Sequence, residues 1–195
     1  MIITIGRQHG SNGHDIAKKL SEKLGIPCYD KEIVDEAARG SDLNKDVLES
    51  FDEKKVLPVF SGFGASFNLN ATIASSQFEA IRTLADKGDC IFVGRCADYV
   101  LRSRSDLVKV FIYADYPYRV RTIMERKELS EDKAKKLIKE VDKDRSSYYR
   151  YYTDNSWGDM TNYELCLDSS RTGVDGAVEV IEAFIKNLNA DNAIF

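Results

Sequence analysis

The chain begins with Met1-Ile-Ile-Thr-Ile-Gly-Arg-Gln-His-Gly-Ser-Asn-Gly-His-Asp15-Ile-Ala-Lys-Lys-Leu20, a short apolar run followed by a glycine-rich turn and a helical pattern. This order predicts a strand whose turn presents converging N–H groups, with the positive end of a helix dipole behind them. Such an arrangement favours an anion, and a phosphate in particular. Gly6, Gly10 and Gly13 supply the backbone freedom that the turn needs. The alternative is a strand, turn and helix corner in which the glycines serve geometry only.

The turn departs from the Walker A pattern G-x-x-x-x-G-K-[ST], in which the lysine reaches the outer phosphates and the hydroxyl holds magnesium. Gly13 is followed by His14 and Asp15, so no lysine follows a glycine of the turn. His14 lies at the start of the helix and is a candidate donor to phosphate, with a charge that is tunable near neutral pH. The alternative is a solvent-facing or capping histidine.

Length and composition are those of an ordinary globular chain. It has 195 residues, enough for one domain with a core, and we expect a single domain over residues 1–195. The formal net charge of -4 argues against a nucleic-acid partner, which an excess of Lys and Arg would indicate. No apolar run approaches the roughly 20 residues that span a bilayer, and the first strand is too short for a signal peptide.

The four cysteines, Cys28, Cys90, Cys96 and Cys166, are isolated and lack C-x-x-C spacing. Three of them lie in or beside apolar strand-like runs, which predicts buried thiols rather than disulfides or metal ligands. We therefore expect a protein of the reducing cytoplasm.

Apolar strand-like runs alternate with helical patterns along the chain. Near-continuous apolar strands separated by helices predict an α/β fold with a parallel sheet covered on both faces. In such a sheet a ligand lies beyond the carboxyl ends of the strands, where the glycine-rich turn would lie if the first strand is central. The expected strands are Ile2–Ile5, Pro27–Tyr29, Cys90–Val93, Val108–Tyr113 and Glu164–Leu167. The expected helices end at Gly25 and Gly88, begin near Pro117 and Ser130, and include a last one over about Val174–Leu188.

Two stretches break this alternation. Residues 56–70 interleave proline and glycine with phenylalanine, which suits either a mobile segment over a substrate or a loop packed by its own aromatics. Residues 145–153 interleave tyrosines with Arg145 and Arg150. Such residues stack on bases and grip phosphates, and they are also typical of a homo-oligomer surface or of packing within the chain.

With these features in place, the chain resembles the cytidylate kinase-like family of nucleoside monophosphate kinases. The resemblance covers almost the whole length and rests on four stretches that together are fairly specific to the fold. They are Ile3-Thr-Ile-Gly-Arg-Gln-His-Gly-Ser-Asn-Gly-His-Asp15 running into Gly25-Ile-Pro-Cys-Tyr-Asp30, Val93-Gly-Arg-Cys-Ala-Asp98, Val108-Lys-Val-Phe-Ile-Tyr-Ala114 followed by Arg119, and Leu165-Cys-Leu-Asp-Ser-Ser170.

The resemblance implies a P-loop NTPase-type three-layer α/β fold, with a five-stranded parallel sheet of order 2-3-1-4-5 and helices on both faces. It implies an acceptor-binding segment over about residues 31–88 and an arginine-bearing lid over about residues 128–155. The implied activity is transfer of the ATP γ-phosphoryl group to a small acceptor, a nucleoside monophosphate such as CMP, with Mg²⁺ as cofactor.

The same resemblance implies roles for individual residues. Arg95 matches an arginine that contacts the acceptor phosphate. Asp30 matches the aspartate that ends the strand-like run after the first helix, and with Asp98 it is a candidate substrate-binding residue. Arg145 and Arg150 fall in the lid region, although the usual spacing of arginine and aspartate there is not reproduced. The ATP phosphates are expected on Gly10, Ser11, Asn12, Gly13, His14 and Asp15.

The departures from the family pattern concern the charged groups. Gly13 stands where cytidylate kinases carry the P-loop lysine, and His14 stands where a magnesium-binding hydroxyl often lies. Val93 replaces an aspartate before the Gly-Arg step, and Cys96 replaces the acid after it. Phosphoryl transfer depends on positioning and charge stabilisation, and one good donor is worth roughly 2.7–4 kcal/mol.

Two side chains are hypotheses for the missing groups. Arg7 is a candidate catalytic residue that reaches the phosphates from the other side of the turn, and Asp15 is a candidate ligand of a magnesium-bound water. The alternative function is a nucleotide-binding module, catalytically weak or inactive, that acts through a partner or oligomer surface. A third interpretation is an assembly protein on a kinase scaffold, based on the tyrosines between Tyr148 and Tyr152.

Overall fold

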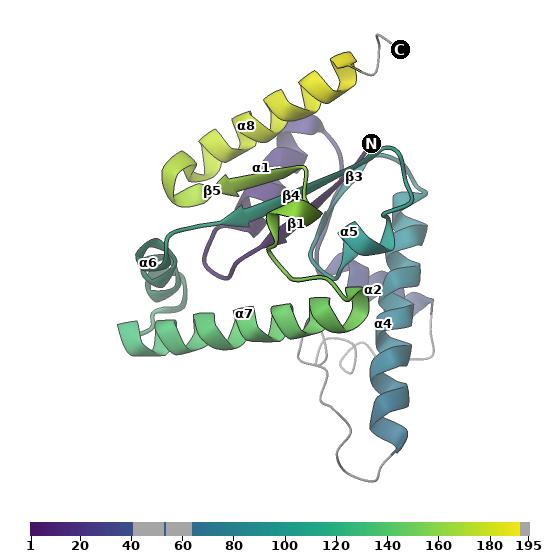
Figure 1. Ribbon diagram of the computed structural model, residues 1–195, viewed down its shortest axis with the longest axis horizontal. Coiled ribbons are helices and arrows are strands. Elements are labelled where there is room, and N and C mark those ends of the chain that lie inside the picture. Colours follow the sequence, from purple (N-terminus) through teal and green to yellow (C-terminus); the bar gives the residue numbers. More distant parts are fainter. Residues whose placement is uncertain (41–52, 54–63, 192–195) are drawn as a thin grey trace.

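The computed structural model describes residues 1–40, 53 and 64–191, and in that part of the chain a five-stranded parallel sheet forms the centre (Figure 1). Its order, β2-β3-β1-β4-β5, confirms the expected topology. The central strand β1 pairs with β3 and β4, so that Ile5 lies between Val93 and Val110. The strands are β1 Ile2–Arg7, β2 Cys28–Tyr29, β3 Cys90–Val93, β4 Leu107–Tyr113 and β5 Leu165–Asp168.

Helices cover both faces of the sheet. They are α1 Gly13–Leu24, α2 Glu32–Arg39, α4 Gly64–Ala85, α5 Ala97–Val100, α6 Tyr116–Lys127, α7 Glu131–Thr153, the short 3-10 helix η1 Met160–Asn162, and α8 Ser169–Asp191. Within α8 the backbone leaves the helical region at Gly173, where φ is 65° and ψ is -175°. None of the helices described is long and apolar enough to pass through a bilayer.

Two apolar cores lie on opposite faces of the sheet. Side chains of α2, α4 and α5, among them Ile33 and Ile81, pack with Ile2 and Phe92 on one face. Side chains of α1 and α8 pack on the other face around Ile3, Ile5 and Val110, and Figure 1 shows these two helices side by side. The three-layer α/β fold is therefore confirmed, with β1 buried at its centre.

The largest difference from the expected elements concerns residues 145–153. They continue α7 to Thr153 instead of interrupting the pattern, because no proline or glycine breaks this helix. Ser130 occupies its N-cap position without a side-chain capping hydrogen bond, contrary to the expected cap. Residues 64–70, expected as part of a loop, lie within α4, whereas residues 56–63 lie outside the described part of the chain.

The thiols follow the prediction in part. All four cysteines are free; Cys90 and Cys96 are buried, and Cys28 and Cys166 are half-buried. Burial raises the pKa of Cys90 to about 12 and that of Cys28 to about 12, so these thiols stay protonated at neutral pH.

Candidate active site

The glycine-rich turn between β1 and α1 is a tight loop fixed by close contacts. Gly10 has a φ of 83°, and a Cβ there would lie 2.8 Å from the carbonyl oxygen of Arg119. A Cβ on Gly13 would lie 2.5 Å from Cβ of Arg7. Both positions therefore need glycine, because a side chain would push the loop away from α6 and β1. The first turn of α1 starts at Gly13 and leaves its leading N–H groups without partners within the helix.

Ser11 anchors this loop to the sheet. It is fully buried, and its hydroxyl lies 2.9 Å from the carbonyl oxygen of Gln8 and 3.1 Å from that of Ile112. Its own carbonyl oxygen accepts a hydrogen bond from the Ser169 hydroxyl at 2.7 Å. These contacts hold the loop against the ends of β4 and β5, so the Ser11 side chain serves the loop shape.

Two charged residues of α6 and α7 close on the loop from the outside. Arg126 donates to Asn12 Oδ1 at 2.8 Å and to Asp15 Oδ2 at 2.5 Å. Asp142 accepts from the His9 N–H at 2.8 Å and from Arg119 at 2.5 Å. Beside this contact an open hollow of about 540 Å³ is lined by Asn12, Tyr118, Arg121, Thr122, Glu125 and Arg126.

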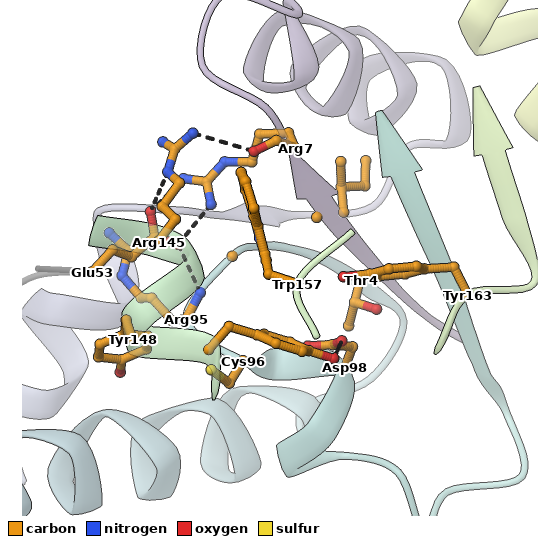
Figure 2. A pocket seen from close by; sticks show the side chains of 14 residues that line it. Thr4, Arg7, Glu53, Arg95, Cys96, Asp98, Arg145, Tyr148, Trp157 and Tyr163 are labelled. Atoms are coloured by element: carbon orange, nitrogen blue, oxygen red, sulfur yellow. Dashed lines mark hydrogen bonds and ion pairs between the residues drawn. The ribbon is translucent and has the colours of Figure 1, made fainter. Parts of the chain in front are cut away.

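Beyond the carboxyl ends of β1 and β3, three arginines surround one carboxylate (Figure 2). We call Arg7, Arg95 and Arg145 the arginine cluster. Arg7 donates to both oxygens of Glu53, at 2.6 Å and 2.9 Å, and Arg145 Nε donates to Oε2 at 3.1 Å. The backbone N–H of Arg95 donates to Oε1 at 2.9 Å. Burial alone would raise the pKa of Glu53, but the charges of Arg7 and Arg145 hold it well below its usual range.

The turn after β3 that carries Arg95 has an unusual backbone. Gly94, Arg95 and Cys96 have φ values of 77°, 54° and 55°, all in the left-handed region. Non-glycine residues rarely adopt this conformation, and here the turn directs the Arg95 N–H toward the carboxylate of Glu53. Strained backbone of this sort clusters at functional sites.

Asp30 joins this turn to the glycine-rich loop. Its Oδ1 accepts from Arg95 at 2.7 Å, and its Oδ2 lies 2.8 Å from Nδ1 of His14 at the start of α1. Burial alone would raise the pKa of Asp30, but the bonds from His14 and Arg95 hold it well below its usual range. The bond to Asp30 raises the pKa of His14. His14, Asp30 and Arg95 thus form one continuous contact between the two expected phosphate sites.

The far end of the same cavity is lined by hydroxyls and one buried acid. Tyr149 donates to Asp98 Oδ2 at 2.7 Å, and burial raises the pKa of Asp98. The Oγ1 of Thr4 is buried and has no hydrogen-bond partner among the residues that the structure describes. Trp157 and Tyr163 complete this end, and Figure 2 shows the arginine cluster and Asp98 at opposite ends of the cavity.

The predicted site residues fall into three groups. The structure brings Arg7, Arg95 and Arg145 together, with Asp30 beside them, and it puts Asp98 at the other end of the same cavity. Gly10 to Asp15 form the loop next to the cluster. Arg150 is exposed, because five residues from Arg145 a helical side chain points to a different side of α7.

Sequence reasoning missed Glu53, Asp142 and Arg126. Glu53 carries no local signal, since its role comes from contacts 42 to 92 residues away. Asp142 has one usable signal: it lies three residues before Arg145, and this spacing places both on one face of a helix.

The glycine-rich loop fits the phosphates of a nucleotide, and the Asp15 carboxylate beside it fits Mg²⁺. The glycine loop and the leading N–H groups of α1 suit phosphate oxygens. In the part of the chain that the structure describes, no three His, Cys, Asp or Glu side chains gather into a metal site. Mg²⁺ is commonly bound by one or two carboxylates with phosphates and water, so the carboxylate of Asp15 is compatible with it once Arg126 moves aside.

The matching family model and two similar proteins carry the description cytidylate kinase-like or cytidylate kinase. The model of the cytidylate kinase-like family matches residues 2–171. A cytidylate kinase of Methanococcus vannielii is 30% identical over 193 residues, covering 95% of this chain and 100% of that protein. A cytidylate kinase of Methanococcus maripaludis is 29% identical, covering 97% of this chain and 100% of that protein.

Solved structures share the fold. An uncharacterized protein from Eubacterium ventriosum superposes with a TM-score of 0.75 at 31% identity, covering 95% of this chain and 98% of that chain. A shikimate kinase from Bacteroides thetaiotaomicron superposes with a TM-score of 0.57 at 14% identity, covering 95% of this chain and 98% of that chain. The second likeness concerns the fold alone. Because the family model matches most of this chain, the chain belongs to the cytidylate kinase-like family.

Proposed function

We propose that this protein is a nucleotide kinase that transfers the ATP γ-phosphoryl group to a nucleoside monophosphate, CMP being the first candidate. The relatives named cytidylate kinase support this activity class. The observation that carries the proposal is the arginine cluster, whose members approach a single buried anion at the carboxyl ends of β1 and β3. Ligands of open α/β sheets bind at this edge.

In the proposed mechanism, the loop from Gly10 to Asp15 binds the ATP phosphates through backbone N–H groups. Arg95 orients the acceptor phosphate, and Asp30 holds the Arg95 guanidinium in place. Asp98 binds the acceptor away from its phosphate. His14 adds positive charge at the start of α1 when it is protonated.

Arg7 and Arg145 take over the charge stabilisation that a P-loop lysine would supply. Arg7 reaches the Glu53 carboxylate from β1, and Arg145 reaches it from α7. A guanidinium group can pair with two phosphate oxygens at once. The carboxylate of Asp15 would hold Mg²⁺ together with the ATP phosphates, and the ion would supply positive charge against the charge of the transferring group. Arg150 lies outside this arrangement and stays a predicted lid residue.

The direct test mixes the protein with ATP, Mg²⁺ and a panel of nucleoside monophosphates and measures ADP. We expect turnover with CMP or a close relative, and about a 100-fold to 1000-fold loss in kcat for R7A or R145A, as for removal of one good electrostatic donor. R102A is the control, because Arg102 stacks on Tyr99 away from the cluster. Absence of ADP with every acceptor would contradict the proposal, and an unchanged rate in R150A would remove Arg150 from the mechanism.

The second candidate is a nucleotide-binding module without turnover. The observation that favours it is the Asp142 carboxylate, which occupies the His9 N–H of a loop that lacks a lysine. An acid there repels phosphates. Thermal stabilisation by ATP without ADP formation would support this alternative over the kinase.

A further inference from the structure

The arginine cluster is an anion site that is already filled. The two oxygens of Glu53 accept hydrogen bonds from Arg7, from Arg145 and from the backbone N–H of Arg95, all between 2.6 and 3.1 Å. The side chain of Glu53 is only 13% exposed. A carboxylate held in this way has the partners that proteins use for phosphate, because both anions accept paired hydrogen bonds from guanidinium groups.

The backbone is shaped around this carboxylate. A Cβ on Gly94 would overlap Glu53 Oε1 and Nη1 of Arg7, so any larger residue there would displace the ends of these two side chains. The left-handed turn from Gly94 to Cys96 directs the Arg95 N–H at the same oxygen. Ion pairs on protein surfaces do not need a strained backbone, and this one is built into the fold.

The free space beside the cluster is small on its inner side and open on its solvent side. The inner cavity between the arginines and Asp98 has a volume of about 20 Å³, enough for about one water. The hollow of about 350 Å³ on the solvent side is lined by the cluster together with Asp30, Lys31, Glu53, Val141 and Asp144. A phosphate that enters from the solvent side therefore meets arginines that already donate hydrogen bonds to Glu53.

We propose that Glu53 is an internal competitor for the phosphate of the acceptor: its carboxylate occupies the acceptor phosphate site and must leave before a phosphate monoester binds. The inference takes its choice of phosphate from the proposed function. Its consequence is quantitative, because a site that is open for only a fraction of the time binds its ligand more weakly by that fraction. If Glu53 fills the site about 90 to 99% of the time, its removal tightens phosphate binding about 10-fold to 100-fold.

The test is calorimetric titration of inorganic phosphate into the wild-type protein and into E53Q, E53D and E53A. We expect phosphate to bind at least about 10-fold more tightly to E53Q and E53A. We expect a smaller gain in E53D, which keeps the charge but withdraws it by one methylene. E36Q is the matched control, because Glu36 also pairs with two cations, Arg39 and Lys87, but lies outside the cluster.

Folding of the variants supplies a second readout. Removal of the carboxylate leaves the arginines facing one another, so E53A should melt at a lower temperature than wild type, and added phosphate should restore much of the loss. Equal phosphate affinity in wild type and E53Q would overturn the inference, as would weaker binding in E53Q. An E53A protein that stays unfolded with phosphate present would also overturn it, since Glu53 would then be a structural partner of the arginines.

The kinase proposal and this inference fail separately. Phosphate binding needs no turnover, so tighter binding in E53Q without ADP formation would keep the competitor and discard the kinase. Turnover together with equal phosphate affinity in wild type and E53Q would keep the kinase and discard the competitor. If both hold, E53Q also lowers the KM for the acceptor while the KM for ATP stays close to the wild-type value.

Discussion

Gly94 packs directly against the side-chain ends of Arg7 and Glu53. Replacement by alanine adds a Cβ that overlaps Arg7 and Glu53 and imposes a φ of 77° on an L-residue. The φ alone costs roughly 1–2 kcal/mol, and the steric clash adds to it. We expect G94A to lose at least about 2 kcal/mol in the free energy of unfolding, measured in urea, and to lose acceptor binding.

Gly25 offers a control for this substitution. Its φ is 67°, close to that of Gly94, but a Cβ there meets nothing within 4 Å. G25A should therefore show only the cost of the backbone conformation, about 1–2 kcal/mol. Equal losses in the two variants would mean that the contacts of Gly94 add nothing.

The contact between His14 and Asp30 predicts a dependence on pH. The bond to Asp30 raises the pKa of folded His14 above its ordinary value of about 6.5. The charged pair therefore stabilises the fold fully below about pH 6.5 and is lost as pH rises through the raised pKa. In thermal melts, the Tm of wild type should exceed that of H14Q by the largest amount near pH 6. The difference in Tm should shrink toward pH 8. A constant gap would exclude titration of His14 as its source.

At the scale of elements, α7 is held to the core by the hydroxyl of Tyr149. This hydroxyl donates to Asp98 at 2.7 Å in a buried contact. Y149F leaves Asp98 buried without that donor, so we expect a loss of about 1–3 kcal/mol in the free energy of unfolding. Y151F is the matched change on the same helix: Tyr151 is 48% exposed and should change stability by less than about 0.5 kcal/mol. Similar losses in both variants would refute the role of this contact.

The elements were largely predictable because their signals are local. Near-continuous apolar runs predict β1, β3, β4 and β5 to within about two residues at each end, and Gly25 ends α1 as expected. The composition of the Tyr and Arg run from residue 145 to 153 suggests a contact surface and conceals the helix that its period predicts. Its spacing of three and four residues is helical, and Tyr148 and Tyr149 are buried against Cys96 as part of α7.

At the scale of the whole molecule, the candidate site was predictable only where the chain itself brings residues together. The glycine loop is continuous in sequence, and Arg95 directly follows a strand that ends beside it. Glu53 and Asp142 meet the loop and the cluster through tertiary contacts, and no local pattern encodes such contacts. Of the four arginines predicted as catalytic, Arg7, Arg95 and Arg145 gather and Arg150 lies outside the cluster. No local pattern indicates the carboxylate of Glu53 at their centre.

The charges of this site also predict how the whole molecule responds to acid. Burial and the charge of Arg145 lower the pKa of His9 to about 4, so between about pH 6.5 and pH 4 only the unfolded chain takes up this proton. Stability should therefore fall by about 2 kcal/mol over this range on account of His9.

The folded pKa values of Asp30 and Glu53 are also depressed, so these carboxylates contribute full stability above about pH 4.5 and lose it as the pH falls further. The loss caused by His9 therefore begins at higher pH than the loss caused by the carboxylates. In melts from pH 7 to pH 4, H9Q should lose less Tm than wild type, whereas E36Q should follow wild type. Parallel curves for wild type and H9Q would show that His9 titrates alike in the folded and the unfolded chain, and that burial and Arg145 do not keep it neutral.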